Sequence, residues 1–116
     1  MATISKLLLG GSTNGKNISI ASTGSAVPTT IHTAIAGTTS FDELWVYGCN
    51  TATASLSCSI TWGATTAIDT TTVLLNPYGG RTLLMDGKLL QNGLIVGAYA
   101  TLGGYIFIDG YCNRIV

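Results

Sequence analysis

The chain has 116 residues, of which 47% are hydrophobic and only 9% are charged, and its formal net charge is zero. A chain of this length is one domain and can bury a core without disulfides or a metal. Typical domains carry about 25% charged residues, so this composition excludes a disordered chain and offers no basic surface to nucleic acid or an anionic membrane.

The first third of the chain predicts three short strands. Residues 4–9 form the first and run into a glycine-rich turn at 10–15, which contains the hairpin dipeptide Asn14-Gly15. Residues 17–21 alternate apolar and polar side chains, as a half-buried strand does. Residues 29–35 are dense in β-branched Thr and Ile and predict the third strand.

The segment 42–63 has the clearest pattern in the chain. In residues 56–62, Leu, Cys, Ile and Trp alternate with Ser and Thr, which places the apolar set on one face of a strand. Residues 43–49 are rich in aromatic and branched side chains, and residues 50–53 interrupt them as a turn would. We therefore predict a β-hairpin whose apolar face belongs to the core.

The second half of the chain predicts short strands separated by turns. The turns are expected at 76–80, at Asp86-Gly87 and at the hairpin dipeptide Asn92-Gly93. Gly103-Gly104 is expected to join the last two strands as a closing hairpin. The strands predicted in this half are residues 67–75, 81–85, 88–90, 94–100 and 105–112.

The expected fold class contains strands alone, because no segment of the sequence shows the 3.6-residue hydrophobic period of a helix. We expect an all-β protein, either a single antiparallel β-sandwich, jelly-roll-like, or a closed barrel of about eight to nine short strands. No linker or repeat divides the chain, so residues 1–116 form one domain, which can carry a short N-terminal arm at 1–6.

Residues 10–17 match the GxxxxGK pattern of a phosphate-binding loop and follow a predicted strand. Residue 17 is Asn instead of the Ser or Thr that binds magnesium, and a strand rather than a helix follows. The pattern therefore indicates a glycine-rich hairpin turn, and we assign no nucleotide, cofactor or metal to it.

His32 is the single histidine, and Cys49, Cys58 and Cys112 are widely spaced without a CxxC motif. A metal site built from such ligands usually needs three or four of them. A Cys–His nucleophile pair stays open, because its members need only meet in space. The favoured interpretation is a hydrogen-bonded histidine and three buried thiols that act as small hydrophobes.

Other side chains that could carry chemistry are also sparse. Asp42 and Glu43 are neighbours on a strand and point to opposite faces, so they do not form an acid–base pair. The Trp and Tyr residues could form a stacking platform for sugars or bases, although on alternating strands such rings usually pack within the protein. We assign no catalytic residue and expect that the protein is not an enzyme.

Four segments resemble small virion proteins of tailed bacteriophages, the capsid decoration or cement proteins. They are KLLLGGSTNGK at 6–16, TTIHTA at 29–34, ELWVYGCN…LSCSITWG at 43–63 and IFIDGYCNRIV at 106–116. The resemblance implies a β-sandwich-like fold, binding to the outer capsid surface, commonly as dimers or trimers, and no enzymatic activity. It carries over no functional residue.

The expected function is therefore that of a virion structural protein on the capsid surface, with the major capsid protein and other copies of itself as partners. A surface with little charge suits a permanent assembly, because it lacks the repulsion that keeps small proteins apart. We expect synthesis in the bacterial cytoplasm without a signal peptide, since the apolar run at 7–9 is too short for one. The alternative is a receptor- or glycan-binding domain of a fibre or tail tip.

The expected interface combines the chain ends with a row of hydroxyl side chains. The ends are apolar, so they either dock on a neighbouring subunit or pack in the domain's own core. The serines occupy a strand face on which Lys or Glu would repel an approaching subunit. The predicted interface residues are Ile4, Lys6, Ser55, Ser57, Ser59, Arg114 and Ile115.

Overall fold

The structure, a computed structural model, describes residues 3–116, which form nine strands and one 3₁₀ turn. The all-β prediction is confirmed for this part of the chain. The elements are β1 (Ile4–Leu8), β2 (Ile18–Ser19), β3 (Thr29–Thr33), β4 (Phe41–Asn50), β5 (Leu56–Trp62), η1 (Ala67–Asp69), β6 (Thr70–Leu75), β7 (Thr82–Leu90), β8 (Ile95–Ala100) and β9 (Ile106–Ile115).

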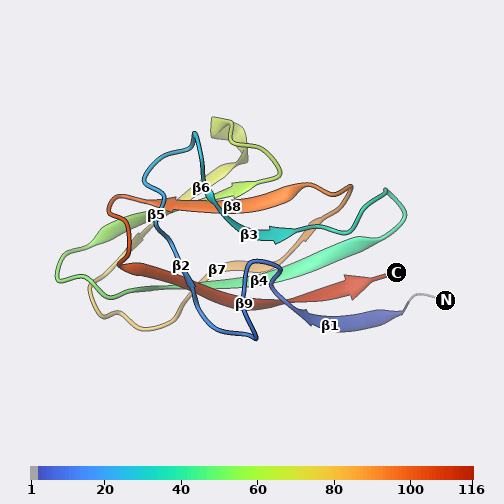
Figure 1. Cartoon of the computed structure of the whole chain (residues 1–116), viewed down its shortest axis with the longest axis horizontal. Coiled ribbons are helices and arrows are strands. Elements are labelled where there is room, and N and C mark those ends of the chain that lie inside the picture. The colour runs from blue at the N-terminus through green and yellow to red at the C-terminus, as the bar shows by residue number, and fades with distance from the viewer. Residues whose placement is uncertain (1–2) are drawn as a thin grey trace.

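The strands form two antiparallel sheets that lie one above the other (Figure 1). Sheet A has the order β1-β9-β4-β7, and the short β2 also pairs with β9. Sheet B has the order β3-β8-β5-β6. The fold is thus sandwich-like, and the alternative of a closed barrel is wrong because the strands divide between two separate sheets.

The core lies between the two sheets. Each long strand alternates, so that one set of side chains points to the other sheet and the second set points outward. On β5 the predicted apolar set is buried, namely Leu56, Cys58, Ile60 and Trp62, although Ser59 and Thr61 of the alternate set are buried too. Each such aliphatic side chain contributes about 1.5–3 kcal/mol by leaving water.

The predicted hairpin over 42–63 is wrong, because β4 belongs to sheet A and β5 to sheet B. Each strand has one apolar face, and placing the strands in opposite sheets buries both faces against each other. Asn50 shapes the crossing between the sheets. Its Nδ2 donates to the carbonyls of Ala54 at 2.9 Å and Leu75 at 3.0 Å, and its Oδ1 accepts from the Ala52 N–H at 2.8 Å.

The predicted closing hairpin is wrong for the same reason, since β8 lies in sheet B and β9 in sheet A. Their connection passes close to another segment at Gly103, where a Cβ would lie 2.6 Å from the Ala21 carbonyl oxygen. Within residues 3–116, β5 and β6 are the only consecutive strands that pair with each other.

The predicted strand end at Asp86-Gly87 is also wrong, because β7 runs unbroken from Thr82 to Leu90. Gly87 is accommodated as a bulge: Leu44 pairs with Lys88, Trp45 pairs with Asp86, and Gly87 has a φ of +81° between them. A bulge at glycine lets a strand absorb one extra residue without ending.

The two ends of the described chain lie side by side (Figure 1). Thr3 and Val116 exchange two backbone hydrogen bonds of 2.9 Å, and Ile4 pairs with Ile115. Residues 3–6 of the predicted arm therefore extend sheet A, while residues 1–2 lie outside the described part.

Candidate functional site

Asp42 is the centre of a buried polar cluster at one end of the sandwich. It follows the same alternation as Leu44 on β4, so its side chain points inward and is fully buried. Its Oδ2 accepts hydrogen bonds from His32 Nε2 at 2.8 Å and the Ile35 N–H at 3.0 Å. Arg114 adds two more, from Nε to Oδ1 at 2.8 Å and from Nη2 to Oδ2 at 2.9 Å.

The cluster joins elements from both sheets. His32 comes from β3 in sheet B, whereas Asp42 and Arg114 come from β4 and β9 in sheet A. The N–H of Gly10 donates to His32 Nδ1 at 2.8 Å. Since Nδ1 is an acceptor, Nε2 carries the proton that is donated to Asp42.

The ionisation of the cluster follows from its contacts. Burial would raise the pKa of Asp42, but hydrogen bonds from Arg114 and His32 outweigh burial and lower this pKa from 3.8 to about 2. Burial, with the Asp42 charge beside it, raises the pKa of the Cys112 thiol to about 12. At neutral pH the cluster thus holds an ionised carboxylate and an un-ionised thiol.

His32, Asp42 and Cys112 offer nitrogen, oxygen and sulfur atoms within 4.8 Å of one another, a ligand set that zinc accepts. The arrangement does not fit a metal ion, because both Asp42 oxygens already accept hydrogen bonds from Arg114, whose charge opposes a cation. The Cys112 thiol would also have to ionise. An Asp42–Arg114 ion pair within sheet A, joined to sheet B by the His32–Asp42 hydrogen bond, accounts for these contacts.

The same geometry argues against a Cys–His nucleophile pair. A general base needs an unprotonated nitrogen that faces the thiol. The unprotonated nitrogen of His32 accepts from Gly10, and its other nitrogen donates to Asp42. The prediction of a hydrogen-bonded histidine is confirmed, and Cys58 and Cys112 are buried as expected, whereas Cys49 is only half-buried.

The GxxxxGK segment is a turn between β1 and β2. Asn14 and Gly15 have φ values of 55° and 84°, as the turn dipeptide predicts. The N–H of Gly11 donates to the Ile31 carbonyl at 2.8 Å, and the N–H of Gly10 is taken by His32, so these donors are not free for phosphate. The turn does not form a hairpin, because β1 and β2 both pair with β9.

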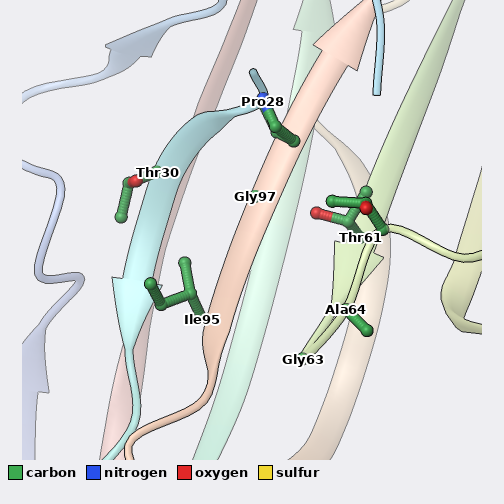
Figure 2. A pocket seen from close by; sticks show the side chains of 8 residues that line it. Pro28, Thr30, Thr61, Gly63, Ala64, Ile95 and Gly97 are labelled. Atoms are coloured by element: carbon green, nitrogen blue, oxygen red, sulfur yellow. The ribbon is translucent and has the colours of Figure 1, made fainter. Parts of the chain in front are cut away.

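A shallow groove of about 230 Å³ crosses the outer face of sheet B, with Gly97 of β8 as its floor (Figure 2). A Cβ at Gly97 would lie 2.8 Å from the Cβ of Pro28 and 2.8 Å from the Oγ1 of Thr61. The only polar side chains in the groove are threonines, so its lining supplies no acid, base or cation. The lining residues are Pro28, Thr30, Thr61, Gly63, Ala64, Thr65, Ile95 and Gly97.

The outer face of sheet A carries a row of aromatic rings that contact the protein itself. Trp45 stacks on Tyr111 with ring centroids 6.2 Å apart, and Lys6 Nζ lies 4.3 Å from the Tyr111 centroid. The Arg81 guanidinium lies 3.6 Å from the Tyr47 ring centroid. A sugar or base needs a free ring face to stack on, and each of these three rings already has a face in contact with another side chain.

Charge is distributed unevenly between the two sheets. Among the described residues, no Lys, Arg, Asp or Glu occurs in the four strands of sheet B, whereas each of β1, β4, β7 and β9 in sheet A carries at least one. We call the outward side of sheet B the uncharged face. Its outward residues are Thr30, Thr33, Ser57, Ser59, Thr61, Thr70, Thr72, Leu74, Ile95, Gly97 and Tyr99.

The predicted interface residues fall on two separate surfaces. Ile4 and Lys6 lie on β1 and Ile115 on β9, on the outer side of sheet A, and Ile4 is 67% exposed. Arg114 alternates with Ile115 and points inward to Asp42, so its guanidinium is already engaged.

The predicted serines lie at sheet B. Ser55 is exposed just before β5, and Ser57 and Ser59 lie on the uncharged face. Ser59 is buried there, and its hydroxyl shares a hydrogen bond of 2.8 Å with Thr72 on the neighbouring strand. Ser55 and Ser57 are therefore accessible to a partner, whereas Ser59, like the neighbouring Thr61, is covered by the domain itself.

Comparisons with protein-family models, curated proteins and solved structures found no match to this chain. Within residues 3–116, the structure contains no helix of the length and apolarity needed to cross a bilayer.

Proposed function

We propose that this protein is a structural subunit of a virion, a non-enzymatic decoration protein that binds the outer surface of a tailed-phage capsid. The observation that carries the proposal is the strand order. Counting from β2, the sheets β2-β9-β4-β7 and β3-β8-β5-β6 follow the order in which a jelly roll arranges its eight strands. Jelly rolls recur in viral capsid proteins, and the order agrees with the sequence resemblance described above.

The uncharged face supports a role based on protein–protein contact. Removing a charged group from water costs several kcal/mol unless a partner compensates for it. The exposed part of the uncharged face presents hydroxyl and aliphatic side chains, among them Thr30, Thr72 and Leu74, so a partner can cover it without that penalty. The major capsid protein and further copies of the chain are the partners we propose for it.

The polar cluster at Asp42 supports the non-enzymatic part of the proposal. The groups that most resemble a catalytic site hydrogen-bond to one another and to the backbone, and none of them lines the groove at Gly97. Every buried side-chain nitrogen and oxygen among the described residues has a hydrogen-bond partner. This is the pattern of a structural network.

Immunogold electron microscopy tests the location. An antibody against the purified protein is expected to label the outer capsid surface of intact particles of the phage that encodes it. Because jelly rolls also occur in lectins, labelling at tail fibres together with retention on a glycan array would replace this proposal with the receptor-binding one. Particles that show no label, and no peptide of this chain by mass spectrometry, would refute it.

A further inference from the structure

We infer that β6 is the strand through which two copies of this chain pair, edge to edge and antiparallel, so that their sheets B join into one. This deepens the proposed function by naming a self-contact. It concerns the purified protein alone, so its failure and that of the capsid role are distinguishable.

The first argument is a comparison of the edge strands, of which β2 has only two residues. Natural sheets protect their edges with charges, bulges, prolines or short strands. β1 carries Lys6 at its centre, and β7 carries Asp86 and Lys88 as well as two register shifts. β3 is short, is broken by a register shift and follows Pro28.

β6 has none of these protections. Residues 70–75 read TTTVLL, without a charged residue or a proline. Its register against β5 runs unshifted from Leu75 opposite Leu56 to Thr70 opposite Thr61. A regular, uncharged and β-branched edge is the kind that accepts another strand.

The second argument concerns the backbone groups at this edge. Ser57 and Gly63 of the β5 segment bond to the β8 side, through Thr101 N–H to the Ser57 carbonyl and Gly63 N–H to the Ile95 carbonyl. Bonding direction alternates along a strand, so the even-numbered residues of β5 bond to β6.

The β6 partners of those even-numbered residues are Thr71, Val73 and Leu75. The N–H and C=O groups of Thr72 and Leu74 therefore point away from β5, to the open edge. The side chain of Thr71 points to the sheet A side and is nevertheless exposed, so none of residues 3–116 covers the edge at this position.

The third argument identifies the occupant as a second copy. When two identical strands meet across a twofold axis, each residue faces a residue of the second copy. A charged residue near the axis would therefore face the same charge in the second copy. β6 carries no charge. The nearest one, Asp69, precedes the strand, and antiparallel pairing places it opposite the far end of the partner's β6.

Apolar side chains beside the edge strengthen this assignment. Ile68 is 92% exposed and Leu74 is 64% exposed. With the twofold axis at Thr72 or Val73, outward-pointing residues of one copy face outward-pointing residues of the other, so the hydroxyl-rich faces of both copies stay on the same side. The joined sheets then present one continuous uncharged face of doubled width.

Sedimentation equilibrium from low micromolar to near-millimolar concentration tests the pairing. We expect the mass to rise from that of the 12.0 kDa chain to twice that value. Leu74→Lys should shift the midpoint at least tenfold to higher concentration, because it places a cation at the edge. Leu8→Lys, the same change at a residue 56% exposed on the edge strand β1, is the matched control and should leave the midpoint unchanged.

Amide hydrogen exchange of the unaltered protein supplies a readout that does not depend on a variant folding. The N–H groups of Thr72 and Leu74 should exchange rapidly in dilute solution and become protected at high concentration. A protein that stays monomeric throughout, or a dimer in which these two amides exchange as fast as in the monomer, would overturn the inference. So would equal effects of Leu74→Lys and Leu8→Lys on the midpoint.

Discussion

Replacing Asp42 with Asn should remove an acid-sensitive part of the protein's stability. A carboxylate whose pKa is lower in the folded than in the unfolded state stabilises the fold above the unfolded pKa, and this contribution disappears as the pH falls through the folded value. For Asp42 these values are 3.8 and about 2. The difference corresponds to about 2 kcal/mol at neutral pH.

The expected result is a difference between two pH profiles. The unfolding free energy of the unaltered protein, measured by urea titration with tryptophan fluorescence, should fall by about 2 kcal/mol more than that of Asp42→Asn between pH 5 and pH 2. Glu43, whose pKa is lowered by hydrogen bonds from Trp45 and Asn113, is present in both proteins and cancels in the difference. At neutral pH the variant should be less stable by at least about 2 kcal/mol, because it leaves the Arg114 charge without its partner.

Asp109→Asn is the matched control. Asp109 also binds an arginine, Arg81, at 2.9 Å, but the side chains of this pair are 31% and 53% exposed. Exposed ion pairs contribute about 0–1 kcal/mol, so this variant should be nearly as stable as the unaltered protein. Parallel pH profiles for Asp42→Asn and the unaltered protein, or equal losses in the two variants, would refute the reasoning.

Three further outcomes follow from local packing and hydrogen bonding. Gly97→Ala should destabilise the protein by about 1–3 kcal/mol in urea unfolding, because its Cβ meets the proline that walls the groove, whereas Gly24→Ala, whose Cβ meets nothing within 4 Å, should not. Asn50→Ala should cost about 2–3 kcal/mol in the same assay, because it leaves buried backbone groups without partners; a loss below that of an exposed Asn→Ala change would contradict this. Burial raises the pKa values of the Cys58 and Cys112 thiols to about 11 and about 12. These two thiols should react with a thiol reagent only as fast as the protein unfolds, and the half-buried Cys49 should react before them. Immediate reaction of all three thiols would contradict this.

The sequence predicted the strands well because alternation is a local signal. In residues 56–62, the apolar residues that alternate with Ser and Thr in the sequence are buried in the structure. Strand pairing was predicted poorly, because a turn dipeptide determines only the local backbone conformation. Asn92 and Gly93 have the positive φ values expected of a hairpin turn, 64° and 67°, yet they connect β7 in sheet A to β8 in sheet B. Which strand becomes a neighbour depends on where both apolar faces can be buried.

The buried cluster could have been predicted in part from the same alternation. Asp42 lies two residues from Leu44 on β4, and Arg114 lies two residues from Cys112 on β9. Each charged side chain therefore points to the same side of its strand as a buried residue. Opposite charges at core positions of two strands predict a buried pair. The contribution of His32 could not be predicted this way, because the register of β3 shifts between Thr30 and His32 and turns the ring inward.

The position of β9 in the sheet has a consequence for how the chain folds during synthesis. β9 follows the other described strands in the sequence, yet it is the neighbour of β1, β2 and β4. Sheet A therefore cannot assemble during synthesis until β9 has left the ribosomal exit tunnel, and β1, β2 and β4 lack this neighbour until then. Such sequence-distant pairing slows folding and leaves strand edges open to other nascent chains in the meantime.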